Sequence, residues 1–301
     1  MTNEIVRSPL FYVGDKYKLI KEIRSHFPST IGRLIEPFVG GGSVFMNTNT
    51  KVCLANDVDK HVIGLHKWLC SYKNCGDELL AQLTNIIDQY GLSFSLIRDD
   101  VSEDLKRKFP KTYFAKYNKE AYSKLRSDYN LTGKKDFCRL YLLLIYGFNR
   151  MLRFNGKGDF NLPVGNVDFN QNTKKAIFDY LNIICQRQLV FTSLDFSDFL
   201  RNINYQENDL IYLDPPYLIT FSEYNKLWNE ETEIRLLLLL DELNDRNIRF
   251  AISNVTLYKG RINNIFLNWA TKYNIYPIKS NYISFNDNTI KKFNEVLVTN
   301  Y

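Results

Sequence analysis

Residues that build metal centres and disulfide frameworks are scarce in this sequence. Its 301 residues include five cysteines and three histidines. The cysteines, an odd number at positions 53, 70, 75, 138 and 185, lack the paired spacing of a zinc site. His61 and His66 lie five residues apart, whereas a zinc pair on one helix face is spaced by about four. This scarcity predicts reduced thiols, no bound metal and a cytoplasmic protein.

Long hydrophobic runs are also missing, so no membrane-spanning helix is predicted. No stretch reaches the roughly 18 consecutive apolar residues that such a helix needs. The first ten residues contain no cationic segment followed by an apolar run, and we expect no signal peptide. Hydrophobic residues still make up 45% of the chain, too many for a disordered tail. Length and apolar content predict a folded core in one large domain or two modest ones.

Positive charge is concentrated in two segments of the chain. The net charge is +6, and within residues 98–157 lysine and arginine outnumber the acidic residues by about two to one. A second basic segment covers residues 256–292, so the remainder is net acidic. Basic charge gathered in this way favours a polyanionic partner such as nucleic acid. A solvated helix face explains the same charges, and charge alone does not decide between the two.

Short apolar runs that end abruptly in a polar residue predict the strands of a parallel sheet. The runs are apolar on both faces, as in strands buried between two layers of helices. Helical patterns at 61–70 and 232–244 lie between several of them, and this alternation predicts a Rossmann-like, doubly wound α/β fold. In such sheets ligands bind at the carboxyl ends of the strands. The runs and the polar residues after them are 33–35 with Glu36, 52–55 with Asp57, 189–192 with Asp195, 210–213 with Asp214, and 250–252 with Asn254.

The alternation is interrupted between residues 71 and 187, where no strand pattern occurs. We predict one α/β domain from residues 1–70 and 188–301, and a mainly helical insert over 71–187. Near the end of the chain, β-branched and aromatic residues at 275–285 and 294–300, around an Asn/Asp turn, predict a hairpin. The helical patterns of the insert span 76–90, 113–129 and 135–146, and a polar loop with several glycines spans 149–168.

A glycine-rich turn follows the first predicted strand. Residues 36–45 read EPFVGGGSVF, and the consecutive glycines let the chain turn tightly and let a ligand approach the backbone. The pattern is neither a dinucleotide-binding motif nor a P-loop, and a plain tight turn would explain the glycines alone. Asp57, about 17 residues after Gly40, ends the next strand, where an acidic residue typically receives ribose hydroxyls. Turn and carboxylate together favour a cofactor that contains a nucleoside.

The segment Asp214-Pro215-Pro216-Tyr217 directly follows another predicted strand. Its two prolines fix the backbone and remove two donors, which leaves a carbonyl group free to accept. A carboxylate, a carbonyl and an aromatic face on one rigid loop suit a planar group that bears an amine. The two oxygens would accept from its N–H groups and the ring would stack on its face. A rigid turn that merely ends a strand requires neither the aspartate nor the tyrosine.

Several of these segments, taken together, match the motifs of one enzyme family. Residues 36–45, 56–57 and 214–217 resemble those of the Dam-type DNA adenine methyltransferases, the alpha group of the D12 class. The order of cofactor motif, recognition insert and catalytic loop is also that of this group. Further similarity lies at 146–149, 153–155, 160–165, 194–196 and 12–16, where Asp15 departs from the Gly-Gly-Lys core that is usual in the family.

The resemblance implies S-adenosylmethionine as cofactor and double-stranded DNA as substrate. The methyl group would pass by direct displacement to the exocyclic amine of a flipped adenine in a short site. A cognate restriction endonuclease that acts separately on the same site is an implied partner, and a phage or orphan role stays open. The residues implied in catalysis are Asp214, Pro215, Pro216 and Tyr217, and those implied in cofactor binding are Tyr12, Lys16, Glu36, Phe38, Gly40, Asp57, Asp195 and Phe196.

The resemblance also implies that the helical insert recognises the target. Arg153 matches the base reader of the family, and arginine suits the two acceptors of guanine. Phe11 stands where a lysine often reads the first guanine, and Arg150 where glycine is usual, so a CATG or other short adenine-containing site fits at least as well as GATC. The residues implied in DNA binding are Phe148, Asn149, Arg150, Met151 and Arg153.

Three other functions compete with this hypothesis, and one feature of the sequence argues against each. A methyltransferase of the same fold that acts on RNA, protein or cytosine would use a related tetrapeptide, although the large basic insert argues for duplex DNA. A non-catalytic DNA-binding protein would need neither Asp214 nor the glycine-rich turn. A nicotinamide oxidoreductase would have no use for the Asp-Pro-Pro-Tyr loop.

Overall fold

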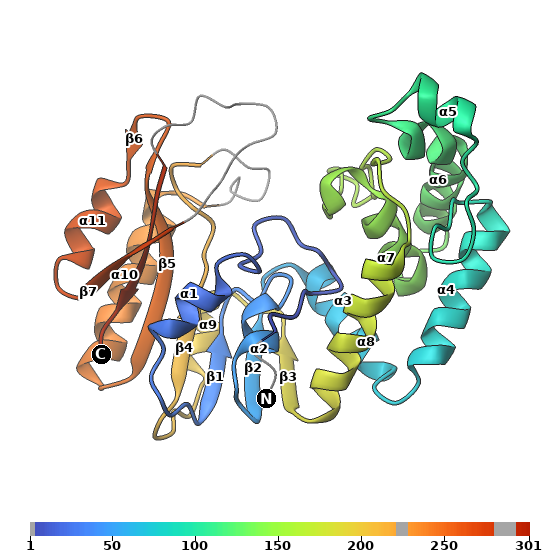
Figure 1. The fold of residues 1–301 in the computed structure, drawn as a ribbon. Helices are drawn as coiled ribbons and strands as arrows, with labels where there is room; N and C mark the ends of the chain where they lie inside the picture. Colours follow the sequence, from blue (N-terminus) through green and yellow to red (C-terminus); the bar gives the residue numbers. More distant parts are fainter. Residues whose placement is uncertain (1–3, 221–227, 280–292) are drawn as a thin grey trace. The chain divides into compact units, whose positions relative to one another are not determined.

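The computed structural model describes residues 4–220, 228–279 and 293–301. The chain divides into two compact units, each assembled from separate parts of the sequence (Figure 1). The first, which we call the helical unit, contains Met1–Asp15, Gly40–Met46 and Lys60–Gln186. The second, which we call the sheet unit, contains Lys16–Val39, Asn47–Asp59 and Arg187–Tyr301.

The sheet unit is built around one sheet with the strand order β3-β2-β1-β4-β5-β8-β7. The first five strands of this order run parallel, which confirms the predicted strands and the Rossmann-like α/β fold. The order reverses between β1 and β4, so the carboxyl ends of these neighbours form a topological switch point. The parallel strands are β1 (Arg33–Glu36), β2 (Val52–Asn56), β3 (Gln188–Thr192), β4 (Leu210–Leu213) and β5 (Arg249–Tyr258).

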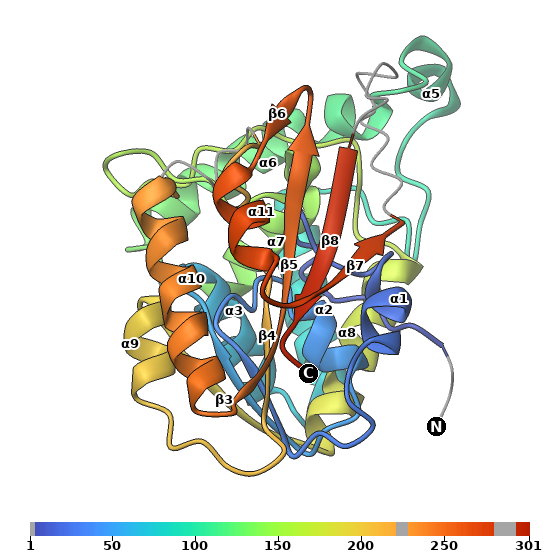
Figure 2. The same cartoon turned by 90° about the vertical axis from the view of Figure 1, so that its left-hand side faces the viewer.

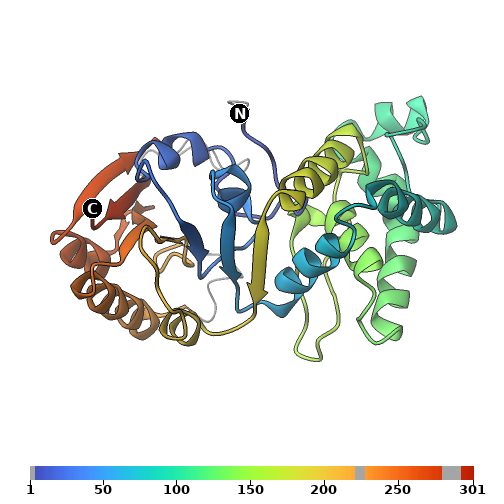
Figure 3. The ribbon, with the colours of Figure 1, turned by 90° about the horizontal axis from the view of Figure 1, so that it is seen from below.

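Helices cover both faces of this sheet because alternate strand residues point to opposite sides. On one face Ile35, Ile211 and Ile252 belong to a buried cluster with side chains of α9 (Phe196–Arg201), α10 (Glu230–Asp245) and α11 (Asn264–Ala270). Figure 2 shows α10 and α11 alongside β5. Figure 3 shows α1 (Ile20–Ser25) on the face opposite to α9 and α10. The helical pattern predicted at 232–244 is confirmed by α10.

The last strands extend the sheet in antiparallel fashion. The strands β7 (Asn274–Ile278) and β8 (Phe293–Thr299) pair as the predicted hairpin requires, with β8 inserted between β5 and β7. The rest of the predicted 275–285 strand and the turn lie outside the described residues. A short hairpin of β5 with β6 (Arg261–Ile262) escaped prediction. Because β5 continues to Tyr258, Asn254 lies inside the strand, and its prediction at a strand end is wrong.

The helical unit contains the helices from α3 to α8 (Figure 1). Its centre is α7, in which every residue from Leu140 to Tyr146 is buried against α3, α4 and α6. The unit includes residues outside 71–187, and the division of function between insert and remainder stays a prediction. Its elements are α3 (Lys60–Ser71), α4 (Gly76–Tyr90), α5 (Glu103–Lys108), α6 (Tyr113–Leu131), α7 (Phe137–Tyr146), the 3₁₀ turn η1 (Phe148–Arg150) and α8 (Gln171–Cys185), while the short α2 (Ser43–Asn47) follows the glycine-rich turn.

Three negative findings apply to the described residues. In those ranges no helix is both long and apolar enough to cross a membrane. All five cysteines are free. Across the same residues, no group of three or more histidine, cysteine, aspartate and glutamate side chains is arranged to hold a metal ion.

Candidate active site and recognition loop

In the sheet unit, Lys16 connects two carboxylates beside the loop that follows β4. Its Nζ atom lies 2.7 Å from Asp214 Oδ1 and 3.7 Å from Glu295 Oε1. The Tyr217 hydroxyl makes a second connection, 2.8 Å from Asp214 Oδ1 and 3.2 Å from Glu295 Oε1. The side chain of Lys16 is 2% exposed and that of Glu295 is 0% exposed, so the lysine charge is compensated inside the protein. Three predicted site residues thus lie together with Glu295.

The two carboxylate oxygens of Asp214 have different surroundings. Oδ1 accepts from Lys16 and Tyr217, whereas Oδ2 has no donor in the described part of the chain. The Asp214 side chain is 19% exposed, so this oxygen is not sealed in the core. The Pro215 carbonyl likewise receives no hydrogen bond from the described residues. One carboxylate oxygen and one carbonyl oxygen are therefore available to accept at the carboxyl end of β4.

Sequence reasoning missed Glu295, which lies on β8. There it faces Val255 of β5 and Ile278 of β7 across the sheet. The strand reads FNEVLVT, with a carboxylate at a buried position among apolar residues. Because burying a charge is costly unless it is paired, an acidic residue in such a run indicates a cationic partner from elsewhere in the fold. The sequence does not identify that partner as Lys16.

Asn56, at the end of β2, fixes the loops that follow β1 and β3. Its Nδ2 donates to the carbonyls of Pro37 (3.1 Å) and Leu194 (3.0 Å). Its Oδ1 accepts from the Thr192 hydroxyl and from the Leu194 N–H, both at 2.9 Å. Asn56 is 0% exposed and all four contacts lie inside the sheet unit. The side chain therefore orders the strand ends where Glu36, Asp57 and Asp195 are predicted to bind a cofactor.

An aromatic group lies beside these strand ends. The Phe38 ring centroid is 5.5 Å from that of Phe196 and 5.7 Å from that of Trp228. Arg235 covers Phe196, with Cζ 4.6 Å from the ring centroid, and its Nη2 lies 2.8 Å from Asp195 Oδ2. Asp195 Oδ1 accepts from the backbone at the start of α9. The predicted residues Phe38, Asp195 and Phe196 thus lie together. Trp228 and Arg235, which were not predicted from the sequence, contact them.

The other two acidic cofactor residues of the prediction also lie at strand ends. Glu36 closes β1 and is 2% exposed. Asp57 follows β2, and its Oδ1 accepts from the N–H of Asp59 at 3.0 Å while its own N–H donates to the Thr192 carbonyl at 3.3 Å. This turn holds the Asp57 carboxylate at the carboxyl edge of the sheet. The binding role of both residues stays a prediction.

The glycine-rich turn is tightly packed within the helical unit. Gly42 has φ +80°, and a Cβ atom there would lie 2.3 Å from Phe45 Cε1. A Cβ atom on Gly41 would lie 2.8 Å from Tyr12 Cβ, and one on Gly40 would lie 3.4 Å from Tyr12 Cδ1. Close approach therefore favours glycine at positions 41 and 42, whereas at Gly40 the positive φ of 47° favours it. The predicted cofactor residues Tyr12 and Gly40 are neighbours in this unit.

His66 fixes the same turn from α3, a role that sequence reasoning missed. Its Nε2 lies 2.9 Å from the Gly40 carbonyl, and its Nδ1 lies 2.9 Å from the Tyr180 hydroxyl. Since a carbonyl can only accept, Nε2 carries the proton and Nδ1 accepts from Tyr180. Burial lowers the pKa of His66 from 6.5 to about 4, against the opposing effect of the Gly40 hydrogen bond. The ring is therefore neutral at neutral pH.

The predicted DNA-binding residues share one loop after α7, residues 147–165, which we call the recognition loop. Phe148 is 51% exposed, and Asn149 adopts φ 52° inside η1. Arg153 donates from Nε to Asn161 Oδ1 (2.9 Å) and from Nη2 to the Asn161 carbonyl (2.7 Å), which sets the orientation of its guanidinium. Asn130 of α6 anchors Phe160, where the loop returns, because its Nδ2 donates to the Phe160 carbonyl and its Oδ1 accepts from the Phe160 N–H. The remaining two predicted residues, Arg150 and Met151, are half-buried.

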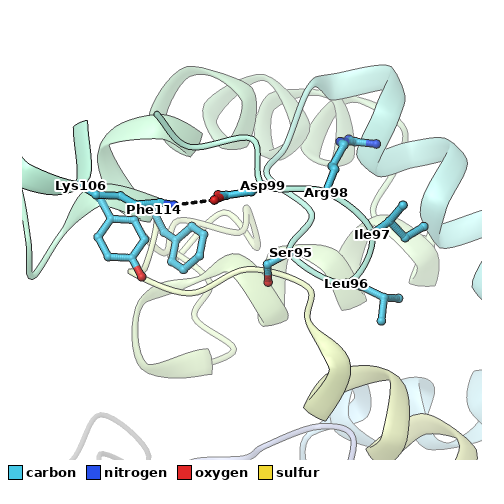
Figure 4. Close-up of a pocket in the computed structure, with 8 residues that line it drawn as sticks. Ser95, Leu96, Ile97, Arg98, Asp99, Lys106 and Phe114 are labelled. Carbon is cyan, nitrogen blue, oxygen red and sulfur yellow. Dashed lines mark hydrogen bonds and ion pairs between the residues drawn. The ribbon is translucent and has the colours of Figure 1, made fainter. Parts of the chain in front are cut away.

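A pocket of about 450 Å³ lies elsewhere in the helical unit (Figure 4). Its cations are already paired, since Lys106 Nζ lies 2.6 Å from Asp99 Oδ2 and Arg98 Nε lies 2.8 Å from Asp100 Oδ1. None of the predicted site residues lines it, and we assign it no part in the chemistry. The lining residues are Ser95, Leu96, Ile97, Arg98, Asp99, Lys106, Tyr113 and Phe114.

The fold and the site define the class of protein: a Rossmann-like α/β fold with available carboxylate and carbonyl oxygens at the switch point of its sheet. The family of D12 class N6 adenine-specific DNA methyltransferases matches residues 12–283, and the chain belongs to this family. The sequence prediction of the family is thereby confirmed.

Three relatives illustrate the extent of the similarity. The type II methyltransferase M.FokI of Planomicrobium okeanokoites is 34% identical over 309 residues, which cover 100% of this chain and 44% of that protein. The modification methylase StsI of Streptococcus sanguinis is 32% identical over 311 residues, with the same coverage of 100% and 44%. The DNA adenine methylase of Escherichia coli (strain K12) is 26% identical over 303 residues, 97% of this chain and 94% of that enzyme. The chain thus spans less than half of the first two relatives.

The neutral His66 predicts a specific loss of stability in acid. Its pKa is about 4 in the folded protein and 6.5 in the unfolded chain, so the unfolded chain takes up the proton first as the pH falls. The neutral ring therefore contributes roughly 3 kcal/mol to the free energy of unfolding above pH 6.5, and this contribution is lost progressively as the pH falls toward 4. Urea unfolding at several pH values, compared with His66→Gln, measures it. Equal pH dependence of the two proteins contradicts the assignment.

Proposed function

We propose that this chain transfers a methyl group from S-adenosylmethionine to the exocyclic amine of adenine in a short double-stranded DNA site. One observation carries the proposal: Asp214 is anchored through Oδ1 to Lys16 and Tyr217 and keeps Oδ2 available. With the Pro215 carbonyl, this oxygen offers two acceptors on a rigid loop, the number of N–H groups on the amine. The proposal covers the activity of this chain and not that of the longer relatives.

The acceptor pair acts on the nucleophile. The adenine amine is a poor nucleophile because its lone pair is delocalised into the ring. Hydrogen bonds from its two N–H groups to Asp214 and Pro215 favour the tetrahedral geometry of attack and stabilise the positive charge that develops on nitrogen. Lys16 and Tyr217 hold the carboxylate in place, so little reorganisation is needed at the moment of reaction.

The base has to leave the helix stack to reach this loop, since the amine of a paired adenine is not accessible to such acceptors. The Tyr217 ring, fixed through its hydroxyl to Asp214, is suited to stack on the flipped base. On the recognition loop, the exposed ring of Phe148 is suited to fill the gap that the base leaves in the duplex.

The side chains at the strand ends fit the parts of S-adenosylmethionine, which supplies an activated methyl group on a positively charged sulfur. The aromatic group of Phe38, Phe196 and Trp228 suits a purine ring, and the carboxylate of Asp195 suits its amine. Asp57 is placed to receive ribose hydroxyls. Glu36 supplies a negative charge for the ammonium group of the methionine part. Lys16, which the resemblance assigns to the methionine carboxylate, is 2% exposed and paired with Asp214 and Glu295, so we propose that it positions Asp214 instead. For Tyr12 and Gly40, which belong to the helical unit, the assignment to the cofactor rests on the resemblance alone.

The names of the relatives support a biological setting. M.FokI is described as a type II methyltransferase, and StsI as a modification methylase. We extend this to the present chain as a role beside a cognate restriction endonuclease that cuts the same site when it is unmethylated.

Methyl transfer to unmethylated genomic DNA tests the function. The purified chain is incubated with S-adenosylmethionine labelled in the methyl group, the nucleosides are analysed, and the modified sites are mapped. We expect N6-methyladenine at one short motif and no label in cytosine, RNA or protein. A folded chain that binds the cofactor but labels none of the DNA, or labels cytosine alone, contradicts the proposal.

Asp214→Asn tests the acceptor in the same assay. The change keeps the size of the side chain and removes its charge, so the developing positive charge loses its partner. We expect the turnover rate to fall at least about a hundredfold, with cofactor binding and DNA binding retained. The exposed Glu207→Gln, which removes the same charge elsewhere in the sheet unit, is the matched control. Full activity of Asp214→Asn excludes Asp214 from the mechanism.

Glu295→Gln tests the second carboxylate. Without this charge Lys16 binds Asp214 more strongly, and Asp214 becomes a weaker acceptor for the amine. We expect kcat to fall about tenfold, equivalent to about 1.4 kcal/mol, with DNA affinity and site preference unchanged. Steady-state kinetics on a defined duplex, with Glu207→Gln again as control, measure the effect. Unchanged kcat in the folded variant shows that Glu295 acts only in packing.

A further inference from the structure

An arginine of the recognition loop is stacked on a buried phenylalanine within the helical unit. The Cζ atom of Arg150 lies 3.9 Å from the ring centroid of Phe11, and that of Arg7 lies 4.8 Å from the same centroid. Phe11 is only 5% exposed, while Arg150 is half-buried and Arg7 is exposed. One aromatic ring therefore carries two guanidinium groups, a cation–π arrangement that limits their movement.

The backbone on both sides of this stack adopts an unusual conformation. Phe11 has φ 47°, Asn149 has φ 52° and Arg150 has φ 50°. Asparagine enters this left-handed region readily, whereas phenylalanine and arginine do so at an energetic cost. Such conformations persist where the surrounding structure imposes them, and they are concentrated at sites that bind ligands.

Hydrogen bonds hold both segments of the stack in place. The Ser8 hydroxyl donates to the Gly41 carbonyl, and the Tyr141 hydroxyl donates to the Pro9 carbonyl at 3.0 Å. The N–H of Arg150 donates to the Gly147 carbonyl at 3.1 Å. The ring and the guanidinium above it are therefore positioned by the body of the unit and not by a free loop.

Arg150 forms no ion pair with the described residues. No carboxylate within those ranges lies at ion-pairing distance, and its buried Nε has no acceptor there. Burial lowers the pKa of Arg150 to about 10, and the nearby Arg7 charge acts in the same direction, while Tyr141 and the more distant Asp168 carboxylate oppose it. The group stays charged at neutral pH. A cation partly removed from water without a partner is costly, and acceptors from a ligand would remove that cost.

We propose that Arg150, seated on Phe11, reads a guanine of the target site through the O6 and N7 atoms of that base. The inference rests on the proposed function and adds a determinant of its specificity. A planar guanidinium in a fixed orientation matches these two acceptors. Arg153 has committed two of its donor groups to Asn161, whereas Arg150 makes no side-chain hydrogen bond to the described residues. A phosphate contact requires charge but not a stacked, half-buried geometry.

Site mapping of variants tests the proposal. Arg150→Lys keeps the charge and removes the planar fork, and Phe11→Leu removes the ring on which the fork rests. We expect Arg150→Lys to lower kcat/KM on the wild-type site by about ten- to a hundredfold and to accept other bases at one guanine position. Phe11→Leu should relax the same position. Arg107→Lys, an exposed arginine of α5, is the matched control and should leave the site unchanged.

A chemical substitution in the DNA tests the contact in the unaltered protein. Duplexes that carry 7-deazaguanine at each guanine of the site in turn lack one N7 acceptor at a time. We expect one of these duplexes to be a poorer substrate than normal DNA for the wild-type chain, because its guanine no longer offers N7 to Arg150. This arm does not depend on whether a variant folds.

Each other outcome overturns the inference. An unchanged site in Arg150→Lys, or equal use of 7-deazaguanine by the wild type, excludes base reading. A uniform loss over all sequences with a shallower salt dependence identifies a phosphate contact instead. If Phe11→Leu relaxes the base preference at a different position, Phe11 does not orient Arg150 for base reading. A wild-type chain that methylates no DNA contradicts the proposed function itself, a result distinct from all of these.

Discussion

A lysine ammonium group withdrawn from water has to be matched by negative charge, and this requirement organises the sheet unit. Lys16, in the segment before α1, is paired with Asp214 of the loop after β4 and with Glu295 of the strand β8. Breaking such a buried group by removal of one partner is far more costly than any surface ion pair. The same requirement therefore joins three distant parts of the sequence and fixes the carboxylate on which the proposed chemistry depends.

The topology explains why the remaining site residues fall nearby. Since β1 and β4 are neighbours across the reversal of strand order, the loops after them meet at one edge. Asn56 then determines how the loops after β1 and β3 lie, through four hydrogen bonds with no contact to solvent. A buried amide with all its groups satisfied specifies one arrangement, because any other leaves polar atoms unpaired.

The sequence predicted the parallel strands and the longer helices well because both depend on local patterns of apolar residues. Asp214 could be singled out from the sequence because aspartate, proline and tyrosine are adjacent there, and its role stays a prediction. Glu295 and His66 were missed because their partners lie far away in the chain, and no local pattern encodes a distant contact. Asn254 was misplaced for a related reason: pairing with β8 and β6 carries β5 beyond the residue at which its apolar run ends.

The cations of the two predicted sites differ in their pairing, and this difference agrees with the proposed division between chemistry and recognition. In the sheet unit Lys16 and Arg235 both have carboxylate partners, so the site is preorganised before any ligand arrives. In the helical unit Arg150 is stacked and oriented but lacks such a partner among the described residues. A rigid cation with unused donors is stabilised most by a ligand whose acceptors match its geometry, and least by a ligand whose acceptors do not. In the proposed function, site preference therefore depends on the unpaired donors of Arg150, and the rate depends on the paired carboxylate of Asp214.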